Sequence, residues 1–308
     1  MFTKKGIFSI SFIIIMLFVY VMVSKETPIS FVDSSKVDVL ATSEDILDVD
    51  LYSSNAILVN LDNNQVLLDK NSEERIYPAS LTKMMTVLVS IEHIQNLQQE
   101  VVLPKNIFHD LYEKNASMAG FLPNEQLTVE NLLYGSMLPS GAEASIGLAE
   151  YITGSEEEFV KLMNNKAQQL GMINTHFMNT TGLHHPEHYT TVQDITLLLQ
   201  YALTNSEFRQ IYTAERYSIK QTNRHPEGMT FTNRMFQHMT SGELSAGEIL
   251  GGKTGYTEEA GLCLASLATV NGQEYILVTV GAKGDPRTEQ YNITDAFLVY
   301  RQLSGGNI

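Results

Sequence analysis

Ser80 and Lys83 stand three residues apart at the start of an apolar stretch, "SLTKMMTVLVS". Pro78 favours an extended residue before it, so the pattern predicts a helix from about Ser80 to about Gln95. At this spacing the two side chains share one helix face, beside backbone N–H groups that can stabilise an oxyanion. If that face is buried, desolvation lowers the pKa of the lysine, and its neutral amine can accept the serine proton. A capping serine beside a solvated lysine is the alternative, and the motif alone leaves both open.

Two further segments carry hydroxyl and amine groups at an expected turn and at an expected strand start. Ser140 lies in a Pro-Ser-Gly break between two apolar segments, where a turn can present its hydroxyl. Lys253-Thr254-Gly255 follows a glycine pair and is expected to open a strand, so that the backbone can approach a ligand closely. A lysine beside a threonine suits an anionic group such as a carboxylate. A capping serine and a strand-edge lysine are the structural alternatives.

The elements that would position these residues predict an α+β fold. Hairpins are expected around Asp62 to Asn64 and around Asn271-Gly272, near the two ends of the exported part. Apolar periodicity predicts helices over 80–95, 127–138, 141–152, 155–171, 191–205 and 291–303. The terminal strands would then form one antiparallel sheet, and the middle of the chain would supply a helical layer.

The N-terminus predicts export. Lys4 and Lys5 precede an uncharged apolar run over residues 6–24, which at about 1.5 Å per residue just spans a bilayer core of about 30 Å. The lysines place their own end in the cytoplasm and the rest of the chain outside. A cleaved signal peptide is the competing interpretation, but no A-x-A-like site follows the run. We expect a tail (1–5), a single-pass anchor (6–24), a polar linker (25–48) and a folded domain (49–308).

Bulk composition argues against a nucleic-acid partner. The 308 residues suffice for one large domain or two modest ones. They include 20 basic and 35 acidic residues, a net charge of −15, without the Lys/Arg cluster that a phosphate-binding surface needs. Cys263, the only cysteine, lies in the apolar run "GLCLASLATV", which favours a buried strand thiol over a nucleophile.

The three motifs together resemble the ordered set of the penicillin-recognising serine enzymes, with S-x-x-K at Ser80, S-G-x at Ser140 and K-T-G at Lys253. The text around them, such as "LLYGSMLPSGAEASIGLAE" and "HFMNTTGLHHPEHYTTVQDI", resembles the low-molecular-mass penicillin-binding proteins, the serine D-alanyl-D-alanine carboxypeptidases. The resemblance runs from about Asn55 to Leu303. It implies a penicillin-binding/β-lactamase-like transpeptidase fold, with an antiparallel sheet from both chain ends and a helical middle region.

In that family a serine attacks the peptide bond between the two terminal D-alanines of a peptidoglycan stem peptide, without a cofactor. The resemblance implies that Ser80 is the nucleophile and Lys83 its general base. Ser140 would relay a proton between Lys83 and the leaving amine, and water would hydrolyse the acyl-enzyme. β-Lactams mimic the D-Ala-D-Ala end and are expected to acylate Ser80. The protein would work outside the membrane of a bacterial cell.

The substrate-binding positions also follow from the resemblance. Lys253 and Thr254 would hold the substrate carboxylate. The backbone N–H groups of Ser80 and Tyr256, which flanks Gly255, would form the oxyanion hole.

Two departures from the family pattern stand out. The second motif is usually Ser-Gly-Asn, but here Ala142 follows Gly141, and Glu143 comes next. The asparagine would orient Lys83 and bind the substrate amide, a contact worth about 1–3 kcal/mol if a buried partner is left unpaired. We expect retained but altered activity and β-lactam binding, with Glu143 or a water partly filling the space. Many relatives also carry a β-rich domain and a C-terminal anchor after the closing helix, a role that the N-terminal anchor would take here.

Other interpretations stay open. The segment "GLHHPEHY" could form a zinc site, but its residues lie in a Pro-broken loop, so we expect His188 at most to line the cleft. A β-lactamase shares the motifs but needs a carboxylate that activates water, and none is evident. A non-catalytic penicillin-binding sensor or cell-wall scaffold is the third possibility, because the asparagine is lost.

Overall fold

The computed structural model describes residues 47–239 and 241–305. The predicted anchor (6–24) and nearly all of the predicted linker lie outside these residues. Among the helices that are described, none has both the length and the apolar character that crossing a bilayer requires.

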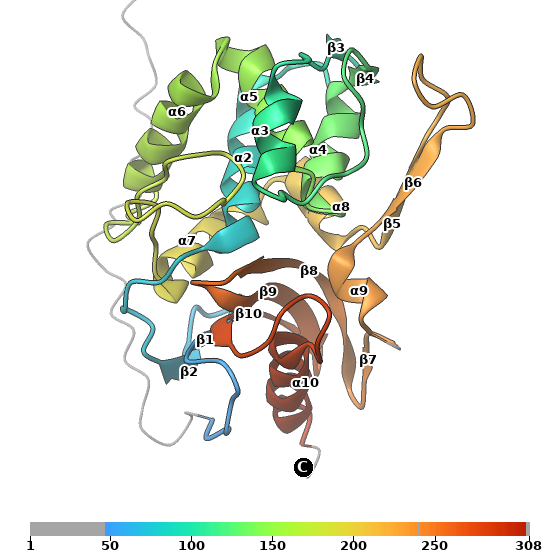
Figure 1. Ribbon diagram of the computed structural model, residues 1–308. Helices are drawn as coiled ribbons and strands as arrows, with labels where there is room; N and C mark the ends of the chain where they lie inside the picture. Colours follow the sequence, from blue (N-terminus) through green and yellow to red (C-terminus); the bar gives the residue numbers. More distant parts are fainter. Residues whose placement is uncertain (1–46, 240, 306–308) are drawn as a thin grey trace, which may run out of the picture. The chain divides into compact units, whose positions relative to one another are not determined.

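A six-stranded antiparallel sheet is built from both ends of the described chain (Figure 1), as predicted. Its strand order is β2-β1-β10-β9-β8-β7. The strands are β1 (Asn55–Asn60), β2 (Val66–Lys70), β7 (Glu243–Leu244), β8 (Gly247–Thr257), β9 (Gly261–Val270) and β10 (Gln273–Ala282). The predicted hairpins join β1 to β2 and β9 to β10, the latter through Asn271 and Gly272 at φ 51° and 78°. The pairing of β1 with β10 then joins the two ends.

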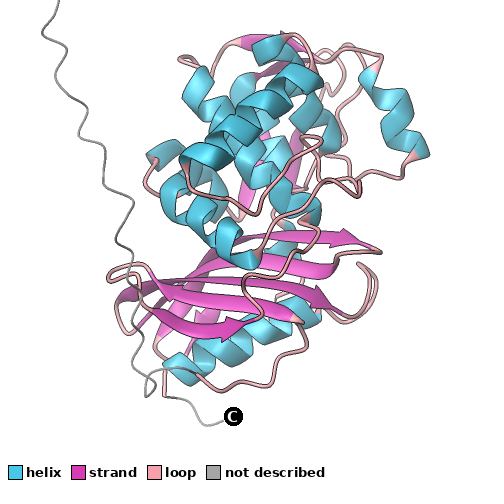
Figure 2. Ribbon diagram, turned by 90° about the vertical axis from the view of Figure 1, so that its left-hand side faces the viewer, coloured by secondary structure: helices cyan, strands magenta, loops and turns pink. Residues whose placement is uncertain are grey.

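Both faces of the sheet are covered, as Figure 2 shows. Along β9, Cys263, Ala265 and Leu267 belong to the core beneath the helical region, because strand side chains alternate between faces. Leu264 and Ala268 belong to a second core under α10 (Tyr291–Leu303). Cys263 is the buried strand thiol that its sequence context predicts, and burial raises its pKa to about 12.

The middle of the chain forms the helical layer. It contains η1 (Ala79–Leu81), α2 (Thr82–His93), α3 (Ile107–Glu113), α4 (Val129–Met137), α5 (Ala142–Thr153), α6 (Glu156–Gln169), α7 (Val192–Ala202), α8 (Ser206–Thr213) and α9 (Arg234–Gln237). Two small two-stranded sheets join it: β3 (Glu100–Val102) pairs with β4 (Gln126–Thr128), with α3 between them in the chain, and β5 (Arg216–Ile219) pairs with β6 (Met229–Thr232). The periodicity of the sequence predicts neither of these sheets, nor α3 and α8.

Helix α2 lies at the centre of this layer. Every residue from Thr82 to Ile91 is buried, because other helices and the sheet surround it. Most of its buried residues are apolar, and the buried hydroxyls of Thr82, Thr86 and Ser90 all have hydrogen-bond partners. Its single lysine, Lys83, is therefore carried into the core, with 2% of its surface exposed.

The expectation that Lys253-Thr254-Gly255 opens a strand is wrong. These residues lie in the second half of β8, which continues through the preceding glycines. A Cβ at Gly251 would lie 2.6 Å from the carbonyl oxygen of Tyr212. The glycine therefore permits close packing of α8 on the strand, and does not interrupt it.

Candidate active site

Ser80 lies in the turn of η1 just before α2, packed between two glycine backbones. A Cβ at Gly182, whose φ is 80°, would lie 1.8 Å from the carbonyl oxygen of Ala79. A Cβ at Gly255 on β8 would lie 3.1 Å from the backbone nitrogen of Ser80. Only glycine allows such close approach. The serine is thus held between a helical-layer loop and the edge of the sheet.

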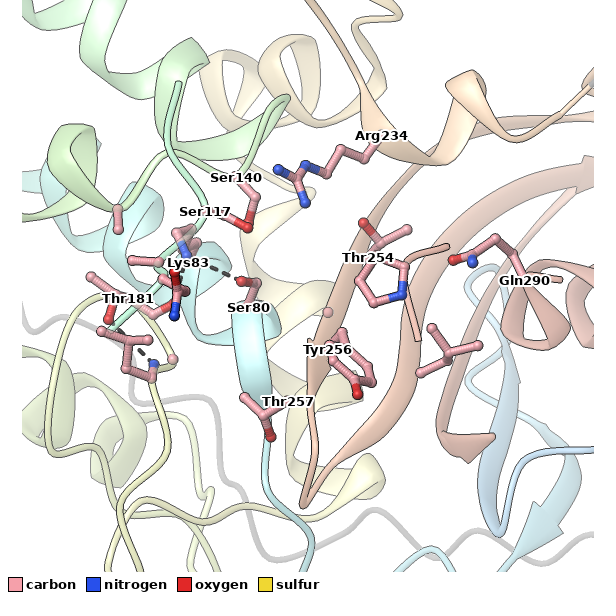
Figure 3. Close-up of a pocket in the computed structure, with 18 of the residues that line it drawn as sticks. Ser80, Lys83, Ser117, Ser140, Thr181, Arg234, Thr254, Tyr256, Thr257 and Gln290 are labelled. Atoms are coloured by element: carbon pink, nitrogen blue, oxygen red, sulfur yellow. Dashed lines mark hydrogen bonds between the residues drawn. The ribbon is translucent and has the colours of Figure 1, made fainter. Parts of the chain in front are cut away.

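Lys83 follows Ser80 by one helical turn and points at it (Figure 3). Its Nζ lies 3.1 Å from Ser80 Oγ and donates to the carbonyl oxygen of Thr181 at 2.5 Å. Burial lowers the pKa of Lys83 to about 7, assisted by the positive charge of Arg234 and opposed by Glu143. A large fraction of this amine is therefore neutral near pH 7 and can accept a proton.

The carbonyl that holds Lys83 belongs to a loop built by Asn179. The Asn179 Oδ1 atom accepts hydrogen bonds from the backbone N–H groups of Thr181 at 3.1 Å and Gly182 at 2.7 Å. Its amide nitrogen donates to the Leu183 carbonyl at 2.9 Å. Our sequence reasoning assigned no role to Asn179, although an asparagine three residues before a glycine is a turn pattern.

Ser140 occupies the break between α4 and α5 in a left-handed conformation, with φ of 68°, which is rare for a residue other than glycine. Its Oγ accepts a hydrogen bond from Lys253 Nζ at 2.9 Å. Lys253 also donates to the Thr254 carbonyl at 2.8 Å. Burial lowers the pKa of Lys253 well below its usual range, and the charges of Lys83 and Arg234 lower it further.

The second half of β8 forms one wall of the cleft. β7 pairs only with Gly247 and Glu248 at the start of β8, so within the described residues the edge beyond them has no strand partner. Thr254, Gly255 and Tyr256 line the cleft along this edge. Lys253 does not line it, because its ammonium lies behind Ser140 and is 1% exposed.

Arg234 also lines the cleft, a position that the sequence did not indicate. In the described ranges no hydrogen bond or ion pair is formed by its guanidinium, and burial lowers its pKa. With Lys83, whose pKa is about 7, and the buried Lys253, it places three basic side chains at or behind one cleft. Such a site suits an anionic ligand.

The cleft has a volume of about 300 Å³ and lies between the helical layer and the sheet. It brings together Ser80, Lys83 and Ser140 from one side with Thr254 and Tyr256 from the other (Figure 3). Ala142 also lines it, at the position where the family usually has asparagine. No aspartate or glutamate is among the described lining residues.

Glu143 and His188, two further candidates from the sequence, lie outside the cleft lining. His188 is 2% exposed and bonds Thr82 Oγ1 through Nε2 at 2.9 Å, and its Nδ1 accepts from the Met178 N–H at 3.2 Å. Burial lowers the pKa of His188 to about 3, so it stays neutral and fastens its loop to α2. Glu143 is fully buried and accepts hydrogen bonds from the backbone N–H groups of residues 119–121, so it does not fill the space beside Ala142.

The other polar residues of "GLHHPEHY" do not converge. His184 lies 3.6 Å from Glu259, and His185 accepts a hydrogen bond from the Glu187 N–H. Over residues 47–239 and 241–305, no three His, Cys, Asp or Glu side chains are arranged to hold a metal ion.

Comparison with known proteins shows the family of this chain. The family described as D-alanyl-D-alanine carboxypeptidase matches residues 39–284. The D-alanyl-D-alanine carboxypeptidase DacF of Bacillus subtilis is 36% identical over 247 residues, which cover 79% of this chain and 60% of DacF. DacC of Escherichia coli is 31% identical over 239 residues, which cover 74% of this chain and 56% of DacC. The chain thus spans less than two thirds of the length of these relatives.

A solved structure has the same fold. The crystal structure of the Streptomyces K15 DD-transpeptidase superposes with a TM-score of 0.74 at 28% identity, covering 84% of this chain and 99% of that one. The expected α+β fold of the penicillin-binding proteins is therefore confirmed. The chain belongs to the D-alanyl-D-alanine carboxypeptidase family.

Proposed function

We propose that this protein is a serine D,D-carboxypeptidase, which removes the terminal D-alanine from peptidoglycan pentapeptide stems. The observation that carries the proposal is the buried Lys83 with its Nζ 3.1 Å from Ser80 Oγ. In the first step, Ser80 Oγ attacks the carbonyl carbon of the penultimate D-alanine while neutral Lys83 takes its proton. The oxyanion is stabilised by the backbone N–H groups of Ser80 and Tyr256.

In the second step, the C–N bond breaks and the terminal D-alanine leaves. Ser140 passes the proton from Lys83 to the leaving nitrogen, so that the product departs as a neutral amine. Water then attacks the ester on Ser80, with Lys83 again as the base, and releases the shortened peptide.

The terminal carboxylate is bound at the Thr254 end of the cleft. The Thr254 hydroxyl and the Arg234 guanidinium bind it, and both residues line the cleft. Lys253 lies behind Ser140 and donates a hydrogen bond to the Ser140 hydroxyl, which it holds in place. The charge of Arg234 favours a carboxylate there while Lys83 stays neutral, so peptides with a free C-terminus are the expected substrates.

β-Lactams are the expected covalent inhibitors. They acylate Ser80 in the same way, but the cleft has no described carboxylate that activates water against the resulting ester. A long-lived acyl-enzyme is therefore favoured over β-lactamase activity. Slow turnover of the chromogenic β-lactam nitrocefin is the expected result.

Substitution of the nucleophile tests the reaction. Ser80→Ala is expected to reduce release of D-alanine from a pentapeptide ending in D-Ala-D-Ala by about a thousandfold or more, because no acyl-enzyme can form. Ser90→Ala is a matched control, since Ser90 is a buried serine further along α2 that bonds only the Thr86 carbonyl. A wild-type protein that releases no D-alanine would favour the sensor or scaffold instead.

The pH dependence tests Lys83 as the base. Below a pKa of about 7 the amine is protonated and cannot accept the serine proton. The rate of acylation by penicillin is therefore expected to rise as the pH passes through about 7 and to level off above it. Lys83→Arg, which stays charged, is expected to abolish acylation at every pH tested. An acid limb near pH 4, typical of a carboxylate, would point to another base.

Position 142 tests the effect of the missing asparagine. Ala142→Asn is expected to raise the penicillin acylation rate of Ser80 by roughly tenfold, because the amide can orient Lys83 and bind the ligand. Leucine has nearly the same shape as asparagine but no polar side-chain atoms, so Ala142→Leu is expected to slow acylation. Equal rates for Ala142→Asn and wild type would show that this family contact is dispensable here.

We also propose that residues 6–24 anchor the protein in the bacterial cell membrane, with the catalytic domain outside. The uncharged apolar run after Lys4 and Lys5 supports this. A chain without residues 1–24 is expected to leave the membrane fraction, whereas the full chain stays there. Recovery of the exported protein with its N-terminus beyond residue 24 would indicate a cleaved signal peptide.

A further inference from the structure

Glu143 makes an unusual set of contacts for a residue next to the second motif. It is fully buried, and its Oε1 atom accepts three backbone hydrogen bonds, from the N–H groups of Ala119 at 2.7 Å, Gly120 at 2.9 Å and Phe121 at 3.2 Å. Its Oε2 atom is buried and has no hydrogen-bond partner among the described residues. A carboxylate held in this way fixes a loop backbone firmly, because hydrogen bonds to a charged group are stronger than hydrogen bonds between neutral groups.

The loop that Glu143 holds forms a wall of the cleft. Asn115, Ala116 and Ser117 line the cleft directly before the three bonded amides. The Ser117 carbonyl also accepts a hydrogen bond from the Ala142 N–H at 2.8 Å. The wall is thus attached twice to the first turn of α5, immediately after the strained turn of Ser140.

The close packing at this point leaves little freedom for the wall. A Cβ at Gly141 would lie 2.6 Å from the Ala119 Cβ and 2.8 Å from the Gly135 carbonyl oxygen. Gly120 has a φ of 106°, a conformation open to glycine. Movement of the wall would therefore be transmitted to Gly141 and to the Ser140 turn before it.

Glu143 also places a negative charge behind the cations of the cleft. Its charge raises the pKa of Lys83, opposing burial and Arg234. Burial raises the pKa of Glu143 itself, and the three loop amides lower it. The charged and titratable groups that act on Lys83 from the surrounding elements are Glu143 on α5, Glu156 on α6, Arg234 on α9, Lys253 on β8 and His188 in the loop before α7.

We propose that Glu143 is a positioning residue for the reaction at Ser80: it fixes the Ser117 wall to the start of α5, and its charge balances the cations around Lys83. The proposal rests on the proposed function for its catalytic consequence. It gives this chain a buried carboxylate in the segment where the family asparagine is missing. Glu143 acts through the loop and through Lys83, and touches no substrate.

The test separates the charge from the attachment. Glu143→Gln keeps an oxygen acceptor for the loop amides but removes the charge. Without that charge the pKa of Lys83 falls, so the acid limb of penicillin acylation is expected to move to lower pH. Glu143→Ala removes both, and its maximal acylation rate is expected to fall roughly tenfold or more. In Glu143→Ala the amides of residues 119–121 are also expected to lose protection against hydrogen exchange.

Glu125 provides a matched control. It is equally buried and accepts the Leu122 N–H at 2.8 Å in the next turn, but its other partners are Thr222 and His225, away from Lys83. Glu125→Gln is expected to lower the free energy of unfolding and to leave the pH profile of acylation unchanged.

Two results would overturn the proposal. One is a pH profile of Glu143→Gln that matches wild type, or that moves equally in Glu125→Gln. The other is equal exchange of amides 119–121 in wild type and Glu143→Ala, which needs no activity to measure. If penicillin fails to acylate even the wild type, the proposed function is wrong. The exchange data then still decide whether Glu143 holds the wall.

Discussion

The burial of one lysine sets the conditions for everything else in the cleft. Helix α2 is buried on all sides over residues 82–91, because other elements surround it, and Lys83 goes into the core with it. Desolvation of an ammonium is costly, and this cost moves the pKa of Lys83 to about 7. The Thr181 carbonyl and the Ser80 hydroxyl then become necessary partners. The loop held by Asn179 supplies the Thr181 carbonyl, and the turn before α2 supplies the Ser80 hydroxyl.

A second constraint is the close approach of backbones around Ser80. Gly182 and Gly255 reach the turn from the helical layer and from the sheet, and neither position has room for a Cβ. Backbone on both sides therefore fixes the position of Ser80, and backbone atoms vary far less in position than side chains do. Ser140 is located in a similar way, by a left-handed turn and by Lys253.

The sequence predicts the parts of this site that depend on local spacing. The start of α2, the Asn271-Gly272 hairpin and the span of α10 follow from residue patterns over a few positions. The missed features depend on contacts between distant segments. Lys253 lies behind Ser140 because β8 passes the α4–α5 turn, and Glu143 faces the 119–121 amides and not the cleft. The glycine pair before Lys253 indicated a strand start, but Gly251 makes room for α8 and Gly252 for Met235 of α9, which no local pattern reveals.

The joining of both chain ends in one sheet bears on when the protein first becomes able to react. Strand β1 pairs with β10, and Ser80 lies beside the edge of β8. The first quarter of the described fold can therefore reach its final structure only after the last strands have been synthesised. During synthesis the early hairpin and α2 have no sheet to pack against, and such long-range pairing forms slowly. The reactive serine therefore acquires its environment only after the late strands have been synthesised and have paired with the early ones.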